Sequence, residues 1–260
     1  MRFKLIYMDM NSDGFETKYR SRFNYHVFVV GYFLTQQLQK IKYDTKGAYE
    51  ALFITVGKDD GPDYMKDNTV WKFIEVNIRF DAAKYDNRSE SERCRYYIEL
   101  YKKALVRANK VATIPLEWLL EQLDVLTEMN YIDSWKFRNM LIRPWGLKIC
   151  FTATLTTNDF TIRAVVYKTG VKAPVCEGQV VRTKPDSLDF GHLTKNMRVE
   201  DGKVIIGYTF ADLFYLDLSE LSKGEFELHL CAPGKYDTDE RSIETHRNLQ
   251  RIFMYEGNDL

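Results

Sequence analysis

The chain has 260 residues, of which 37 are basic and 37 acidic, and 45% are hydrophobic. This length and apolar content suffice to bury a large core without a disulfide or a structural metal. The balanced charge lacks the positive field of a typical nucleic-acid-binding domain, so we expect no nucleic-acid partner. No apolar stretch reaches the roughly 18 residues that a membrane span requires, and the first residues do not have the apolar segment of a signal peptide. The sequence therefore predicts a cytoplasmic protein without a membrane partner.

The first quarter of the chain mixes strand and helix patterns. Apolar runs predict strands over 3–10 and 51–56, and alternation of apolar and polar residues predicts a strand over 74–80. The segment Asn24–Ile41 has apolar residues at helical spacing, whereas its β-branched cluster favours a strand. We interpret this segment as a helix.

Two further helices follow. A capping box that starts at Ser89 begins a predicted helix over 90–109. Pro115 is a favourable first-turn residue and predicts a second helix that ends near Asn130. The next segment, 131–146, is predicted to be an aromatic-rich connection.

The second half of the chain is dominated by strand patterns. Period-two alternation and turn residues predict strands over 149–155, 160–166, 178–182, 204–208, 213–218 and 225–230, and the charged tail over 239–254 favours a helix. The predicted fold class is α+β, with a mixed or antiparallel sheet and two or three packed helices, followed by a C-terminal antiparallel β-rich lobe. We expect a single domain of two packed lobes, over 1–140 and 146–260.

The side chains that could act in catalysis or bind a metal do not form a familiar catalytic motif. His229 follows Glu227 by two residues, so the two side chains would share a face if they lie on a strand. Asp59, Asp60 and Asp63 offer oxygen ligands, but their spacing is not that of a calcium loop and is more typical of a solvated turn. Phosphate loops, zinc spacings and nucleophile elbows are missing. We therefore predict no cofactor and no metal, leave catalytic residues unassigned, and favour a protein that is not an enzyme.

The best candidates for binding a partner lie within the aromatic-rich connection. Trp135, Arg143 and Trp145 fall within 11 residues of one another, and Trp and Arg side chains carry much of the binding energy at protein interfaces. The alternative is that both tryptophans cover the junction between the two lobes.

A family resemblance covers about residues 38–130. The run from Leu38 to Ala48, the strand region Glu75–Tyr85 and the capped helix over 89–108 succeed one another in an order that resembles bacterial immunity proteins encoded beside polymorphic or contact-dependent toxins. The resemblance implies a protein-binding module that neutralises a cognate toxin by binding it. An enzyme with a noncanonical site and a structural component of a phage or bacterial assembly are the alternatives.

Overall fold

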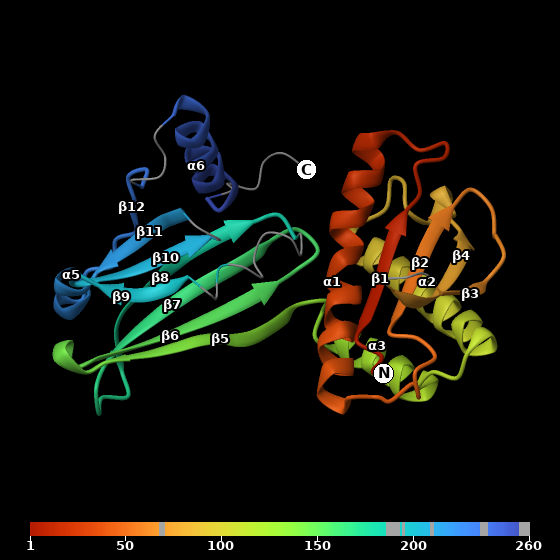
Figure 1. The fold of residues 1–260 in the computed structure, drawn as a ribbon, viewed down its shortest axis with the longest axis horizontal. Helices are drawn as coiled ribbons and strands as arrows, with labels where there is room; N and C mark the ends of the chain where they lie inside the picture. The colour runs from red at the N-terminus through yellow and green to blue at the C-terminus, as the bar shows by residue number, and fades with distance from the viewer. Residues whose placement is uncertain (68–70, 186–192, 194–195, 209–210, 235–238, 255–260) are drawn as a thin grey trace. The chain divides into compact units, whose positions relative to one another are not determined.

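The chain forms two compact units, Met1–Asp133 and Ser134–Leu260 (Figure 1). The computed structural model describes residues 1–67, 71–185, 193, 196–208, 211–234 and 239–254. The fold class predicted from the sequence is confirmed, because a mixed sheet with helices is followed by a region rich in antiparallel strands. Each unit is described by itself.

Unit 1 contains a four-stranded sheet and three α-helices. Its sheet order is β1-β2-β4-β3, in which β1, β2 and β4 are parallel and β3 is an antiparallel edge strand. The elements are β1 (Leu5–Met10), α1 (Thr17–Ile41), β2 (Ala51–Gly57), β3 (Tyr64–Asp67), β4 (Lys72–Arg79), the 3-10 helix η1 (Ala82–Lys84), α2 (Glu90–Val111) and α3 (Leu116–Glu128).

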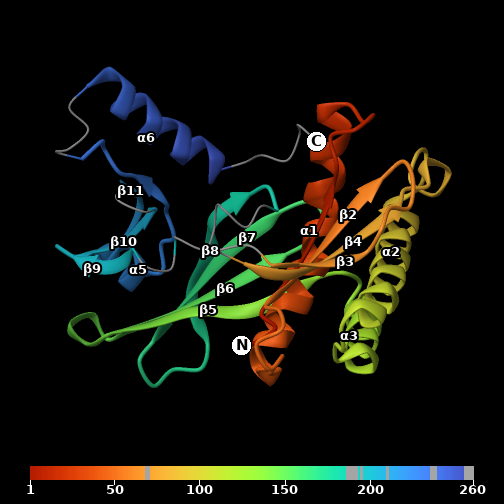
Figure 2. The same ribbon diagram turned by 45° about the vertical axis from the view of Figure 1, so that its right-hand side comes forward.

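The core of unit 1 is built from side chains on one face of this sheet. Met8 pairs with Ile54, which pairs with Val76, and all three are buried. Since side chains alternate between faces along a strand, the rows two residues before and after are buried as well. Helix α1 lies along β1 and α2 lies along β4, and α3 packs on both helices (Figure 2).

The segment Asn24–Ile41, whose pattern was compatible with a helix and with a strand, is helical, as we interpreted it. Helix α1 begins at Thr17, seven residues before the predicted start, because the polar first turns were not part of the apolar pattern. Its β-branched residues Val27, Val29 and Val30 are fully buried. Tertiary burial therefore outweighs their local preference for a strand.

The capping box that was predicted for the second helix is present. The Ser89 hydroxyl accepts a hydrogen bond from the backbone N–H of Glu92, and the Glu92 carboxylate accepts one from the backbone N–H of Ser89. Both bonds satisfy amide groups that would otherwise lack a partner at the helix start.

The acidic loop after β2 is tied to α2 by an arginine fork. Nε and Nη2 of Arg107 donate to the two carboxylate oxygens of Asp63 at 2.6 and 2.7 Å. Nη1 donates to Asp60 at 2.7 Å, and Nη2 also donates to the carbonyl of Gly61. Lys103 donates a further bond to Asp60, which lowers the pKa of that carboxyl group. The carboxylates of Asp60 and Asp63 are therefore held by cations of the protein. The sequence favoured a solvated turn, and Asp60 is half exposed, but Asp63 is only 16% exposed because Arg107 holds it.

We expect Arg107→Lys to destabilise unit 1 by about 1–3 kcal/mol, because an ammonium group cannot reproduce the two-pronged bond to Asp63. Arg107 is 20% exposed, so solvent screens this network only in part. The control is Lys103→Ala, whose ammonium group is more exposed and whose ion pair is worth about 0–1 kcal/mol. Urea unfolding measures both variants, and equal losses would contradict the role given to the arginine fork.

A neutral histidine is buried between α1 and α2. His26 is 5% exposed, and its Nδ1 lies 3.2 Å from the hydroxyl oxygen of Tyr97. The pKa of His26 is lowered to about 4, mainly by burial and in part by the positive charges of Arg22 and Arg93, whereas Glu90 acts in the opposite direction. The His26 imidazole therefore becomes protonated at lower pH in the folded protein than in the unfolded chain.

The pKa of His26 predicts an acid-sensitive unit 1. Between pH 7 and 5 the unfolded chain binds more protons at this residue, so the free energy of unfolding should fall by about 2 kcal/mol as the pH drops. Urea unfolding at several pH values should show this loss for the natural chain and a smaller one for His26→Gln. An identical pH dependence in the two proteins would refute the buried neutral state.

Unit 2 contains two four-stranded sheets, ordered β5-β6-β7-β8 and β12-β11-β10-β9. Both are built from hairpins, and α5 contacts both β8 and β11 and so links the two sheets. The elements are β5 (Asp133–Ile142), the 3-10 helix η2 (Arg143–Trp145), β6 (Leu147–Leu155), β7 (Phe160–Lys168), β8 (Pro174–Thr183), β9 (Met197–Glu200), β10 (Lys203–Tyr208), β11 (Ala211–Asp217), α5 (Leu218–Lys223), β12 (His229–Leu230) and α6 (Glu240–Ile252).

The core of unit 2 receives side chains from both sheets. Phe151 and Phe160 are fully buried on the first sheet, and Val204 and Phe214 are fully buried on the second. Helix α6 lies against β11 (Figure 1), and the amide of Gln250 donates to carbonyl groups of two neighbouring strand segments. The predicted C-terminal helix is therefore anchored by buried hydrogen bonds as well as by apolar contacts.

The predicted connection over 131–146 is largely a strand, which corrects the sequence interpretation. Strand β5 occupies ten of these residues. Its less exposed side chains alternate at Trp135 and Phe137, but the pattern then shifts by one residue to Met140 and Ile142. This shift interrupts the period of two on which a strand prediction depends.

Among the described residues, the helices are too short or too polar to cross a membrane.

Candidate functional site: the surface at the β5–β6 turn

The turn between β5 and β6 places two of the predicted binding residues at the surface. Helix η2 consists of Arg143, Pro144 and Trp145, and it is closed by a hydrogen bond from the backbone N–H of Gly146 to the carbonyl of Arg143. Gly146 has φ of 59°, a left-handed conformation that glycine adopts at little cost. The turn is therefore a defined structure that fixes the direction of its side chains.

Trp145 is 40% exposed although its ring lies against a neighbouring hairpin. The ring passes 3.7 Å from the position that a side chain would occupy at Gly202, in the turn between β9 and β10. Asp201 and Gly202 both have positive φ there, which is the backbone conformation that a tight two-residue hairpin turn requires. One edge of the indole thus lies beside the β9–β10 turn, while 40% of the residue is exposed.

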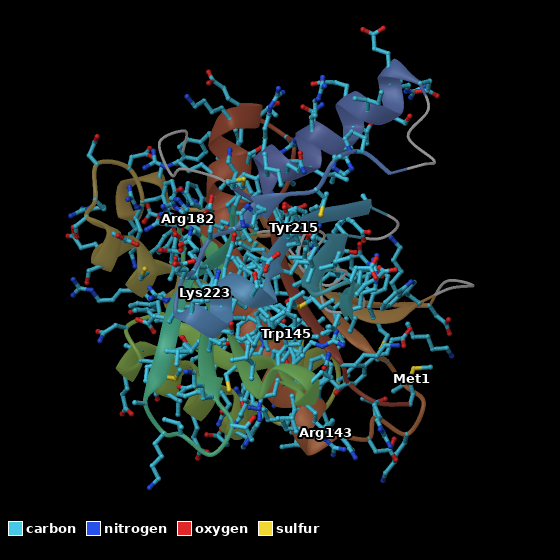
Figure 3. The ribbon with its side chains drawn as sticks, turned by 90° about the vertical axis from the view of Figure 1, so that its left-hand side faces the viewer. Met1, Arg143, Trp145, Arg182, Tyr215 and Lys223 are labelled. Carbon is cyan, nitrogen blue, oxygen red and sulfur yellow. The ribbon has the colours of Figure 1, made fainter. Side chains whose placement is uncertain are left out.

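A second turn extends this surface. The backbone N–H of Thr169 donates to the carbonyl of Gly146 at 2.8 Å, which brings the β7–β8 turn beside η2. Exposed apolar side chains flank Trp145 in the chain and on this second turn. We call the set Leu141, Arg143, Trp145 and Val171 the η2 patch. Figure 3 shows unit 2 from this end, with Arg143 and Trp145 labelled.

The rim of the η2 patch is mainly basic. Lys148, Lys168 and Lys172 are exposed on the two strands and the turn beside it, and they add to the charge of Arg143. Asp201 supplies a carboxylate at the margin. A protein surface that fits this patch would therefore combine an apolar pocket with nearby carboxylates.

Trp135 lies away from the η2 patch. It stands near the start of β5, eight residues before Arg143, and a strand rises by roughly 3.3 Å per residue. It is half-buried, with its ring centroid 6.0 Å from that of Phe160. Arg143 and Trp145 thus lie in one exposed turn, whereas Trp135 packs at the other end of the hairpin.

Glu227 and His229 lie side by side, although Glu227 precedes β12, so the pair does not lie on one strand, which the expectation from their spacing required. A carboxylate oxygen of Glu227 lies 3.9 Å from Nδ1 of His229. A closer partner, Glu220 on α5, was not predicted, and its carboxylate lies 2.8 Å from Nε2 of the same ring. Asp217 caps the short helix α5 that carries Glu220, but a cap does not indicate which strand that helix approaches.

The outer face of the unit 1 sheet is a second accessible surface. A depression of about 360 Å³ there is lined by aromatic rings, with Tyr7 and Trp71 each 36% exposed and Phe53 between them. The rings of Phe53 and Phe73 contact each other edge to face at 4.8 Å. This face also carries the carboxyl groups of Asp9 and Glu75 among its lining residues, whereas the rim of the η2 patch is mainly basic.

No protein-family model, no curated protein and no solved structure matches this chain.

Proposed function

We propose that the chain is a protein-binding module that acts in the cytoplasm as a bacterial immunity protein and neutralises a cognate toxin by binding it. The observation that carries the binding role is the exposed Trp145 beside Arg143 in a closed turn. Tryptophan and arginine are the residue types that dominate binding energy at protein interfaces.

The turn geometry favours tight binding at low entropic cost. The hydrogen bond at Gly146 and the contact of Trp145 with the Gly202 turn hold the indole in place before a partner arrives. Side chains that are already ordered lose less conformational freedom on association. The free indole surface is then available to fill a pocket of the partner.

The positive charge around the η2 patch indicates the charge of the partner's surface. The basic rim formed by Arg143 and the three neighbouring lysines favours a toxin surface rich in Asp and Glu. Opposite charges accelerate association at low salt, and this acceleration decreases as salt screens the charges.

The resemblance to immunity proteins supports the class of function but lies in unit 1, over residues 38–130. The η2 patch lies in unit 2. We assign the toxin contact to unit 2, because its exposed turn combines the residue types and the fixed geometry that an interface requires.

The test begins with affinity purification of the tagged full chain from cells that also express the protein encoded by the neighbouring gene. We expect one stoichiometric partner that is toxic when expressed alone. The chain should protect cells against this partner, and variants with a weakened interface should protect them less. Trp145→Ala and Arg143→Ala should each weaken binding by about 30-fold or more, the effect of a typical hot-spot residue. Isothermal titration calorimetry with the purified partner measures these affinities.

The matched control is Trp71→Ala, which removes an indole of similar exposure from unit 1. We expect it to change the affinity by less than about threefold, as contacts outside a hot spot do. Recovery of the chain without a partner would contradict the immunity proposal. An equal loss in the Trp71 and Trp145 variants would contradict the assignment to the η2 patch.

A further inference from the structure

A histidine and two glutamates of unit 2 converge beside α5. Nε2 of His229 lies 2.8 Å from a carboxylate oxygen of Glu220, and Nδ1 lies 3.9 Å from one of Glu227. One ligand atom from each residue lies within 4.8 Å of the other two. We propose that His229 and Glu227 bind a divalent transition-metal ion, with Zn²⁺ as the best fit, and that Glu220 orients the imidazole of His229 from the other side of the ring.

The imidazole ring of His229 is positioned by its neighbours. His229 pairs across the strands with Tyr215, and the two rings stack with their centroids 4.8 Å apart and their planes 19° from parallel. The Tyr215 ring in turn has the ammonium group of Lys203 4.3 Å from its centroid. The stack and the hydrogen bond to Glu220 fix the ring plane, so that little ordering is required when an ion binds.

The hydrogen bond to Glu220 defines which nitrogen is available to a metal. An ionised carboxylate only accepts hydrogen bonds, so Nε2 of His229 carries the proton that faces Glu220. In the neutral ring the lone pair is then on Nδ1, on the side of Glu227. A carboxylate that holds the far N–H of a metal-binding histidine is a recurrent feature of zinc sites, because it orients the ring and makes it a stronger ligand.

The distance between Nδ1 and the Glu227 carboxylate suits an ion between them. Bonds from Zn²⁺ to nitrogen and to oxygen are each about 2.1 Å, and their sum slightly exceeds the 3.9 Å separation. The Glu227 side chain is 71% exposed, so it can rotate to complete the geometry. Imidazole with carboxylate suits Zn²⁺, whereas Mg²⁺ and Ca²⁺ prefer oxygen ligands alone.

The sequence did not point to this site because its residues do not match a metal-binding spacing. Glu220 stands on α5 and His229 on β12, and the chain between them turns back to bring the two together. The site shares no residue with the η2 patch, so the metal proposal stands independently of the immunity proposal.

The proposal is tested by titrating the purified full chain with Zn²⁺ in competition with a chromophoric chelator. We expect one equivalent to bind, and His229→Ala and Glu227→Gln each to weaken binding by at least about tenfold. Glu220→Ala should cost about 10- to 100-fold, as loss of a carboxylate behind a metal-bound histidine does. Glu227 is exposed, so its variant should fold normally.

Two control variants separate this site from other zinc ligands. Glu225→Gln changes an exposed glutamate two residues from Glu227, and Cys231→Ser removes a thiol two residues from His229; both should bind Zn²⁺ as the natural chain does. Absence of Zn²⁺ binding in the natural chain would overturn the proposal. An unchanged affinity in the His229 variant, or equal losses in the Glu225 and Glu227 variants, would overturn it as well.

Discussion

Unit 1 depends on the register of its parallel strands. The apolar residues that face the core must be paired with one another across neighbouring strands. Parallel pairing aligns Met8, Ile54 and Val76, and a slip of one residue would turn the whole apolar row of a strand towards solvent. Helix α1 provides the long crossover that parallel β1 and β2 require. The Arg107 fork then fixes the loop that leads from β2 towards β3 and β4.

Unit 2 buries its apolar side chains with antiparallel hairpins instead of parallel strands. Its exposed candidate binding residues lie in the turns that connect the strands of these hairpins. A hairpin must reverse the chain in a few residues, and Gly146 and the Asp201–Gly202 pair do so with left-handed backbone. Such turns hold their side chains outside the core. Trp145 therefore stays exposed at a turn whose backbone is closed by a hydrogen bond.

Local patterns predicted most elements of the fold, because helix caps, tight turns and period-two alternation depend on neighbours in the chain. The capping box at Ser89 and the hairpin at Gly202 are examples. Strand β5 was missed since its alternation shifts in the middle. The sequence also named Arg143 and Trp145, but it could not show that Trp135 lies at the other end of the strand, or that Glu220 joins His229, because both facts depend on tertiary contacts.

Hydrogen exchange of the full chain with and without its partner measures whether the η2 patch is the surface that binds the partner. If it is, backbone amides over 141–148 and 168–172, where the patch and its basic rim lie, should gain protection in the complex. Protection confined to unit 1, for example over β1 and β2 at the aromatic face of the sheet, would contradict this assignment. Exchange is read at the amides of both units in one experiment, so neither result depends on a mutation.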